Sequence, residues 1–362
     1  MAYYDNIKTR IDYLRLAASE QPASFSVLAG ELNCQTAASL WGREHLFACR
    51  VVCSSETDFL PLLAGFMPSD MDTNLHPRIT NLIAGPGVEN SELNTMTEPE
   101  IIQSYENGGI GYIWAALAPL LRSTGGPAEK LDRPSRARMP RRPSTGGSSR
   151  GSIGYVENPA KPLAEDFTVR LLSCMIRSVL NYAQPSNKGA PFLQYRDERL
   201  GYTYAYRGKR FEAIDDGGIQ LMSPDSSLQV ALLEAKRSFQ VIDEGHPTVS
   251  DEFLGQVVGE ALAARRSGGL ITRENVVSIL AVGHYVKFIH LSMPDEFNKE
   301  FDSIEPTERN ASLDTYLHIF PTKWFNVATS TGRKHVVRHL LALIAWADGL
   351  YQEQTEDDPM DD

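Results

Sequence analysis

Asp216, Glu234 and Lys236 are the ionisable residues whose types and spacing could support chemistry. The apolar run VALL passes directly into Glu234-Ala-Lys236, so a strand that reads as buried ends with a carboxylate and an ammonium group. Because side chains alternate along a strand, Glu234 and Lys236 share one face. We take FEAIDDGGIQLM and LQVALLEAKR as antiparallel strands joined by Ser-Pro-Asp-Ser-Ser, whose composition is that of a turn. This hairpin predicts that all three side chains meet in one patch.

The choice of Asp216 rests on the register of that hairpin. Residues that face one another across an antiparallel pair have a constant sum of residue numbers, so a turn centred on Asp225 places Asp216 opposite Glu234. Asp215 then points to the other face of the sheet. Asp225 follows Pro224, but it lies at the turn and therefore far from the patch.

The chemistry that such a patch could support is metal-assisted hydrolysis. Two carboxylates on adjacent strands can bind Mg²⁺ or Mn²⁺, which bridges to a substrate phosphate and activates a water molecule. Lys236 could orient that water and neutralise the developing negative charge. The structural alternative stays open, because Glu234 and Lys236 could form an ordinary ion pair at a strand edge, which contributes only about 0–1 kcal/mol.

The elements that must position these residues follow from the hydrophobic pattern after residue 160. A helix is predicted from Leu163 to Ala183, and short alternating runs then predict several strands, including PFLQY and YTYAY. Ser250 is a good N-cap for a helix that continues to about Arg266. The strands VVSILAV and HYVKFIHLS meet at a glycine turn, and a final apolar helix covers His335 to Leu350. The pattern predicts an α/β fold with a central mixed sheet flanked by helices.

We divide the chain into four parts on composition. Residues 1–121 are predicted to be a mainly helical N-terminal region, in which Ile7, Ile11 and Leu14 form an apolar helix face. Residues 122–152 are expected to be a disordered basic linker, because they offer almost no apolar side chains to a core. Residues 153–351 form the predicted α/β domain, and residues 352–362 form an acidic tail.

The linker and the tail carry opposite charges. From Arg122 to Arg150 there are eight basic residues and two acidic ones, whereas Gln352 to Asp362 holds six acidic residues and no basic one. The linker segment RARMPRRP could be a nuclear localisation signal, a phosphate-binding arm or simply solvated chain. The whole chain has a formal net charge of -11, which argues against broad, sequence-independent coating of nucleic acid.

Composition also narrows the class of protein. No run of about 18 apolar residues predicts a membrane span, and the charged N-terminus MAYYDNIKTRIDYLRLAAS lacks the apolar core of a secretion signal. The four cysteines form no disulfide-like framework. We therefore expect an intracellular protein, nuclear or cytoplasmic, with no membrane partner.

Asp216 followed by Glu234-Ala-Lys236 at the end of an apolar strand resembles the PD-(D/E)xK nuclease superfamily. More narrowly, DDGGIQL, ALLEAKRSF and SDEFLGQVVGEALA together resemble a fungal branch of that superfamily, whose members are mostly of unassigned role. The likeness covers about residues 160 to 350. It departs from the family pattern at one point, because no proline precedes Asp216 and the Pro-Asp pair lies at the turn.

The resemblance implies a restriction-endonuclease-like fold and a role for each residue of the patch. Asp216 and Glu234 would bind Mg²⁺ or Mn²⁺, and Lys236 would assist catalysis. Glu165 matches an additional metal-binding acid on the first core helix, and Gln256 matches a glutamine on the helix after the Glu-x-Lys strand. Glu165 could instead be an ordinary first-turn acid favoured by the helix dipole, and Gln256 a solvated helix position.

The implied activity is that of a metal-dependent nuclease that hydrolyses phosphodiester bonds, with DNA as the expected partner. The alternative, from another class, is a catalytically inactive nuclease fold that serves as a binding or scaffold protein. The acidic body of the chain makes this alternative credible.

Two further groups of residues are candidates for core or surface roles rather than for chemistry. His45, Cys49 and Cys53 recur every four residues and could share a helix face, but no fourth zinc ligand is spaced nearby, so core packing is expected. His335 and His339 begin the last helix, where we expect a solvated face.

Overall fold

The computed structural model describes most of the chain. Of the sequence predictions, the linker from residue 126 onward, the tail from residue 357 onward and the turn residue Asp225 lie outside the described residues. The described residues are 2–28, 37–67, 75–105, 109–125, 164–206, 209–224, 226–236, 238–243, 246–301, 303–308 and 312–356.

Helices account for most of the N-terminal region and for both flanks of the sheet. They are α1 (Tyr3–Asn6), α2 (Arg10–Glu20), α3 (Phe25–Leu28), α4 (Arg43–Ala48), α5 (Pro77–Ala84), α6 (Asn90–Thr95), α7 (Glu98–Ser104), α8 (Ile110–Gly125), α9 (Ala164–Ala183), α10 (Asp251–Ser267), α11 (Asp295–Glu300) and α12 (Ser330–Glu356), with the 3-10 turns η1 (Ala38–Leu40), η2 (Pro61–Phe66) and η3 (Leu313–Thr315).

The strands form one large mixed sheet and two small hairpins. The large sheet contains β1 (Val51–Cys53), β2 (Phe192–Arg196), β5 (Gly218–Met222), β6 (Ser227–Lys236), β9 (Asn275–Val282), β10 (Tyr285–Ser292), β11 (Leu317–Pro321) and β12 (Phe325–Asn326). The two hairpins are β3 (Gly201–Tyr206) with β4 (Lys209–Ile214), and β7 (Val241–Asp243) with β8 (His246–Thr248).

The order of the large sheet is β1-β11-β10-β9-β6-β5-β2, and β12 pairs with β10 beside this path. Strands β6 and β9 run parallel, whereas β5 and β6, β2 and β5, and β9 and β10 are antiparallel. Parallel neighbours need a long crossover connection, and α10 lies in the connection between β6 and β9. The prediction of an α/β fold with a central mixed sheet flanked by helices is therefore confirmed.

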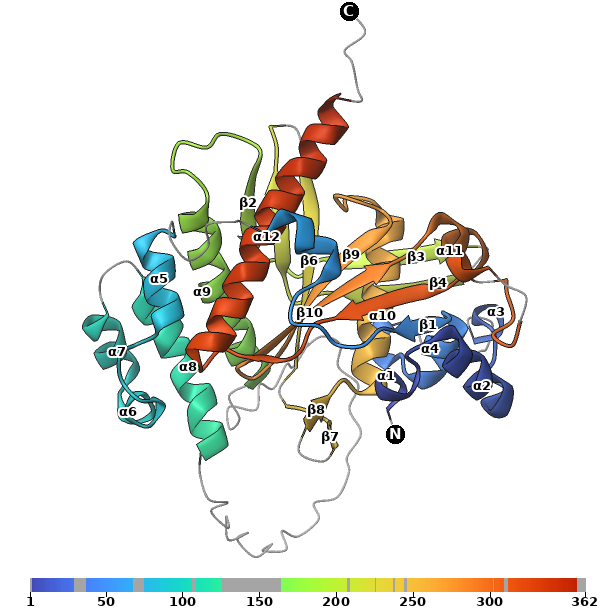
Figure 1. The fold of residues 1–362 in the computed structure, drawn as a ribbon, viewed down its shortest axis with the longest axis horizontal. Helices are drawn as coiled ribbons and strands as arrows, with labels where there is room; N and C mark the ends of the chain where they lie inside the picture. Colours follow the sequence, from blue (N-terminus) through green and yellow to red (C-terminus); the bar gives the residue numbers. More distant parts are fainter. Residues whose placement is uncertain are drawn as a thin grey trace, which may run out of the picture.

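Two hydrophobic cores lie on the two faces of this sheet (Figure 1). Helices α8, α9 and α12 cover the face to which Leu233 and Ala235 of β6 point. Helix α10, together with α1, α2 and α4, covers the opposite face, to which Leu232 points. Because side chains alternate along β6, Glu234 and Lys236 lie on the α10 face.

The two helices that the pattern predicted around the site are confirmed. Helix α9 starts one residue after the predicted Leu163 and ends at the predicted Ala183. Its apolar side chains are buried in the core, namely Leu171, Leu172, Met175, Ile176, Val179 and Leu180. The side chain of Ser250 accepts a hydrogen bond of 3.1 Å from the Phe253 amide, so it caps α10 as expected.

The prediction that FEAIDDGGIQLM is one strand of the hairpin is wrong. The segment forms two strands in different sheets, because β4 pairs with β3 and only β5 pairs with β6. The break falls at Asp215, Asp216 and Gly217, where Gly217 takes a φ of 135° that disfavours side chains.

Near the site, the register between β5 and β6 agrees with the prediction, but it does so because of a bulge that was not predicted. Gly218 pairs with Leu232, as a turn centred on Asp225 requires, but Met222 pairs with Ser227, one residue short of that register. A bulge after Ile219 absorbs the difference.

The N-terminal region is mainly helical, but its predicted apolar face is wrong at one position. Ile7 is fully buried, whereas the side chain of Ile11 is 78% exposed, because α2 begins only at Arg10 and buries Tyr13 and Ala17 instead. The region also contributes a strand to the large sheet, since β1 pairs in parallel with β11.

Candidate functional site

Asp216 lies at the break between β4 and β5, directly against the end of β6. Its backbone N–H donates to the Leu233 carbonyl at 2.9 Å, and its carboxylate oxygen Oδ2 accepts a 3.0 Å hydrogen bond from the Ala235 amide. The carboxylate is thus attached to the backbone between Glu234 and Lys236. The sequence predicted Asp216 beside these two residues, and the structure brings them together.

Gln256, on the second turn of α10, joins Glu234 and Lys236 into one network. Lys236 Nζ donates to Glu234 Oε1 at 2.5 Å and to Gln256 Oε1 at 2.8 Å. Gln256 Nε2 donates to the same Glu234 oxygen at 2.6 Å. Asp216, Glu234 and Gln256 are all buried, while Lys236 is half-buried. Gln256 therefore contacts both charged residues rather than facing solvent.

Glu260 is a member of the site that sequence reasoning missed. It is 1% exposed, and its Oε1 accepts a 2.8 Å hydrogen bond from Gln256 Nε2, which also serves Glu234. Glu260 follows Gln256 by four residues and hence lies on the same face of α10. That four-residue spacing is the signal that could have found it.

The electrostatics of the buried carboxyls favour their neutral form. Burial raises the pKa of Glu234, and although the Lys236 charge opposes this shift, the Asp216 charge adds to it. Burial and the nearby Glu234 hold the pKa of Glu260 well above its usual value. Burial disfavours the charged form of Lys236, but Glu234 and Glu165 raise the pKa of this ammonium group above its ordinary value.

Arg199 contacts the second oxygen of Asp216. Its Nη2 lies 3.1 Å from Asp216 Oδ1 and 3.9 Å from Asp166 Oδ1, and the Arg199 side chain is 52% exposed. Arg199 lies in the loop between β2 and β3, far from the Glu-Ala-Lys segment in sequence. The pattern contained no signal that would bring it to this carboxylate.

Glu165 lies in the first turn of α9, at the edge of the same cluster. It is half-buried, and burial raises its pKa, while the Lys236 and Arg199 charges lower it and the Asp216 charge raises it. These interactions place Glu165 within electrostatic reach of Lys236 and Asp216, on the side from which α9 approaches the sheet.

Asp215 belongs to a separate buried ion pair. Both of its carboxylate oxygens accept hydrogen bonds from Arg196, at 3.1 and 2.6 Å, and Tyr202 Oη donates to Oδ2 at 2.7 Å. The Leu200 amide adds a fourth contact at 3.0 Å. Asp215 thus fastens the β3–β4 hairpin to β2, and its charge adds to burial and Glu234 in raising the pKa of Glu260.

The cluster contains the residue types that bind hard divalent cations. Asp216, Glu234 and Glu165 supply carboxylate oxygens, the ligands that Mg²⁺ prefers. Glu234 Oε2 is buried and has no hydrogen-bond partner within the described residues. This oxygen is therefore an unused acceptor in the cluster. No group of three or more His, Cys, Asp or Glu residues in the described ranges is arranged around a single cation position.

The remaining histidine and cysteine predictions have mixed outcomes. Cys49 and Cys53 are buried in the core as expected, but Cys53 lies on β1, so the three residues do not share one helix face. His45 stacks on Trp41 with ring centroids 4.9 Å apart.

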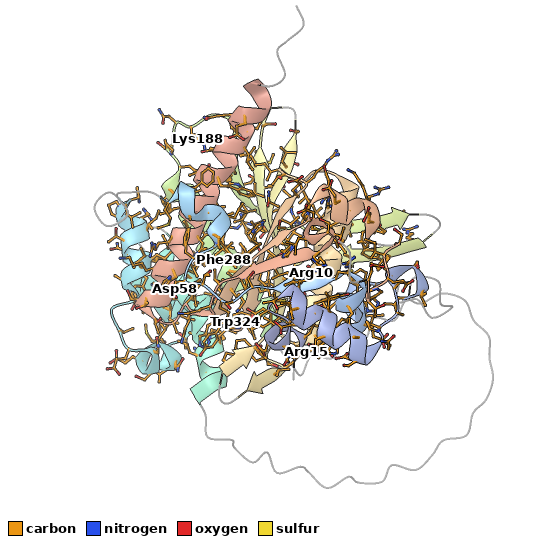
Figure 2. The ribbon with its side chains drawn as sticks, turned by 45° about the vertical axis from the view of Figure 1, so that its right-hand side comes forward. Arg10, Arg15, Asp58, Lys188, Phe288 and Trp324 are labelled. Atoms are coloured by element: carbon orange, nitrogen blue, oxygen red, sulfur yellow. The ribbon has the colours of Figure 1, made fainter. Side chains whose placement is uncertain are left out.

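The solvated face predicted for His335 and His339 is wrong for His339. Its ring is fully buried and stacks at 4.4 Å on the buried ring of Phe288, which is labelled in Figure 2. His339 Nε2 accepts a 3.2 Å hydrogen bond from the Leu60 amide, and burial lowers the pKa of His339 to about 3. The segment before η2 covers this face of α12. The sequence of α12 alone does not show that another segment packs there.

Comparison with known proteins yields no relative. No protein-family model, curated protein or solved structure matches the chain. Among the helices that the structure describes, none is long and apolar enough to cross a bilayer.

Proposed function

We propose that this protein is a metal-dependent nuclease that hydrolyses phosphodiester bonds, with DNA as the substrate and Mg²⁺ or Mn²⁺ as the cofactor. The observation that carries the proposal is the buried pair of carboxylates where the start of β5 meets the end of β6, next to the Lys236 ammonium group. Burying two acids beside one lysine costs folding free energy. Such perturbed ionisable groups are concentrated at functional sites.

Each residue of the cluster has a role in this proposal. Asp216 and Glu234 would hold the cation, with Glu165 as a further acid on the α9 side. The bound cation would lower the pKa of a water molecule and stabilise negative charge on the attacked phosphate. Lys236, held by Gln256 at 2.8 Å, would orient the attacking water and offset the developing charge.

The order of elements supports a restriction-endonuclease-like core for this function. Helix α9 is followed by β2, β5 and β6 as antiparallel neighbours, and α10 then leads to β9 in parallel with β6. This arrangement puts the acids at one end of the β5–β6 pair and Gln256 on the covering helix. A nuclear or cytoplasmic location follows from the proposed substrate.

A second candidate function is a catalytically inactive nuclease fold that binds a partner or serves as a scaffold. The observation that favours it is that both acids already contact a basic side chain of the protein: Glu234 Oε1 accepts from Lys236 and from Gln256, and Asp216 Oδ1 pairs with Arg199. An internal cation at each acid can substitute for a metal ion.

The deciding experiment combines thermal melts with a cleavage assay on the whole chain. For the nuclease, Mn²⁺ raises the melting temperature because it binds the folded state, and single- or double-stranded DNA is cleaved. Glu234→Gln should abolish both responses and leave the protein in EDTA as stable as the parent or more so. Glu252→Gln, on the exposed side of α10, is the control and should keep both.

The inactive scaffold gives a different pattern. The parent protein then shows no Mn²⁺ response, and Glu234→Gln in EDTA loses about 3–5 kcal/mol because Lys236 is left without its buried partner. This pair of results would overturn the nuclease proposal.

A further inference from the structure

Arg50 is a fully buried arginine in the N-terminal region. It lies between α4 and β1 and is 0% exposed, in the part of the molecule where α1, α2, α4 and β1 lie together at the lower right of Figure 1. Its side-chain nitrogens Nε, Nη1 and Nη2 are all buried, and none has a hydrogen-bond partner among the described residues. An internal charge without a partner costs folding free energy, and buried polar groups are rarely left in this state. The guanidinium group therefore needs an acceptor that the described residues do not supply.

The backbone on both sides of Arg50 is fixed. The Arg50 amide donates to the Phe47 carbonyl at 2.9 Å, and Arg50 takes a φ of 52°, in the left-handed region that residues with a side chain rarely adopt. The next residue, Val51, begins β1 and pairs with Leu317 of β11. The fold thus holds the Arg50 side chain in the interior.

Tyr316 lies against the guanidinium group and carries a second unsatisfied donor. The guanidinium carbon of Arg50 is 4.1 Å from the centroid of the Tyr316 ring. This cation–π contact provides no acceptor for the N–H groups, which lie in the plane of the guanidinium. The Tyr316 hydroxyl is also buried and has no hydrogen-bond partner among the described residues. Two neighbouring groups therefore lack a partner.

The buried polar side chains around Arg50 do not balance its charge. Burial raises the pKa of the Cys49 thiol and of the Tyr13 hydroxyl, so both groups stay neutral. The Tyr13 hydroxyl donates to the Phe47 carbonyl at 2.8 Å. The C-terminal end of α4 contributes only a partial negative charge.

The charged residues nearby do not pair with Arg50 either. Glu44 and Asp314, the acids nearest in sequence to Arg50 and Tyr316, are both exposed and bond to neither group. Arg10, labelled in Figure 2, lies 5.7 Å from the centroid of the Tyr316 ring and adds no negative charge. The unpaired charge is therefore that of Arg50 alone.

We propose that Arg50 and the Tyr316 hydroxyl bind a small inorganic anion of single charge, with chloride as the probe. One negative charge balances one guanidinium, and the ion must be compact because the donor atoms are closed off from solvent. Hydrogen bonds from a charged donor to an anion are stronger than neutral ones, and the dry interior strengthens them further. The anion is bound as the chain folds and is part of the folded protein. The inference does not depend on the proposed nuclease activity.

Urea unfolding of the full chain tests the proposal when potassium chloride replaces potassium gluconate stepwise at constant ionic strength. EDTA is present throughout, so that metal ions do not contribute. An ion that binds only the folded state raises the ratio of folded to unfolded protein about tenfold at about ten times its dissociation constant. The parent should therefore gain stability with chloride in a saturable way. A stability that does not rise with chloride would overturn the proposal.

Arg50→Met is the variant, because it removes the charge and keeps an unbranched side chain. It should abolish the gain from chloride and, in gluconate, be at least as stable as the parent. Arg43→Met is the matched control: Arg43 also lies on an aromatic ring, 5.3 Å from the Phe47 centroid, but it is paired with Glu20 at 2.6 Å. It should keep the parent's dependence on chloride. The same dependence in Arg50→Met would show a general salt effect and refute the site.

A direct measurement on the parent protein covers the case in which Arg50→Met does not fold. Crystals grown in bromide, which replaces chloride and scatters anomalously, should show an anomalous peak within hydrogen-bond distance of the Arg50 guanidinium. An anomalous map without a peak beside Arg50 would contradict the proposal.

Discussion

At the scale of single residues, the central feature of the site is the side-chain amide of Gln256, which contacts two buried acids. Gln256 Nε2 donates to both Glu234 and Glu260, two buried carboxyls that cannot both ionise without strong repulsion. A proton held by this pair relieves the repulsion that remains beside the Lys236 ammonium group. The folded protein should therefore bind protons more tightly at these positions than the unfolded chain does.

This leads to a prediction on pH. A carboxyl whose folded-state pKa is raised contributes stability below its unfolded pKa and loses it as the pH rises through the folded value. Glu260 has its pKa raised well above the ordinary 4.5. Glu260→Gln, which keeps an acceptor for Gln256, should thus gain stability relative to the parent as the pH increases above about 4.5. Urea unfolding at pH 5 and pH 8 in EDTA measures the difference.

A tenfold difference in proton affinity between the folded and unfolded states corresponds to about 1.4 kcal/mol in this comparison. Glu252→Gln on the exposed side of α10 should show the same pH dependence as the parent. A Glu260→Gln variant that is uniformly less stable at both pH values would contradict the interpretation, because the ionised carboxylate would then be a favourable part of the fold.

A second residue-scale prediction concerns Arg199, which competes with a cation for Asp216. Arg199→Ala should change the free energy of unfolding by less than about 1 kcal/mol, because the arginine is half exposed and exposed ion pairs contribute little. In the proposed nuclease, removal of this internal cation should also increase the melting-temperature rise that Mn²⁺ produces at a fixed concentration.

Arg210→Ala is the matched control, since Arg210 forms an exposed pair with Glu212 on β4. It should leave the response to Mn²⁺ at the parent value. A smaller response in Arg199→Ala than in the parent would contradict this prediction. It would mean that Arg199 positions Asp216 for the metal ion instead of competing with the ion.

At the scale of elements, α10 is the helix that carries the site. It supplies Gln256 and Glu260, and it packs so closely against the segment around η1 that two of its positions must be glycine. A Cβ on Gly255 would lie 2.8 Å from the backbone of Trp41, and one on Gly259 would lie 2.6 Å from Ala38 Cβ. The position of Gln256 relative to Glu234 thus depends on contacts with the N-terminal region.

Gly255→Ala is expected to destabilise the protein by about 1–3 kcal/mol, because the added methyl group meets backbone that has no room to move. Gly349→Ala in α12 is the matched helical control. The nearest atom to its Cβ would be 3.6 Å away, so the higher helix propensity of alanine should stabilise by up to about 1 kcal/mol. Thermal or chemical denaturation of both variants gives the comparison.

At the scale of the whole molecule, the N-terminal region and the predicted nuclease-like domain share their cores. Residues of α1, α4 and β1 pack in the same hydrophobic cluster as α10 and β9, and α8 packs with α9 and α12 in the other cluster. The Tyr3 amide also donates to Asp251 at the start of α10, at 2.6 Å.

A fragment of residues 153–351 should therefore not fold cooperatively by itself. Without residues 1–121, α9 and α10 would each expose an apolar surface that the N-terminal region covers. Circular dichroism melts of the fragment should show no sharp transition, whereas the full chain should. Mixing the fragment with separately produced residues 1–121 is the control, and recovery of the transition would show that the shared core is the cause. A fragment that melts as sharply as the full chain would refute this view.

Part of this architecture was predictable because it is encoded by neighbouring residues. The spacing of apolar side chains in α9, the Ser250 cap of α10 and the glycine turn between β9 and β10 are local patterns, and all three predictions are confirmed. The same holds for the shared face of Glu234 and Lys236, because alternation along a strand depends on the backbone alone.

Tertiary structure decided which polar groups meet. Arg199, Glu260 and the Asp215–Arg196 pair depend on which loops and helices reach the strand ends. The burial of His339 and the exposure of Ile11 depend on which segments cover their helices. The physical reason is that helix and strand patterns are set by contacts within a few residues, whereas the desolvation and pairing of a charge are set by whatever the completed fold places around it.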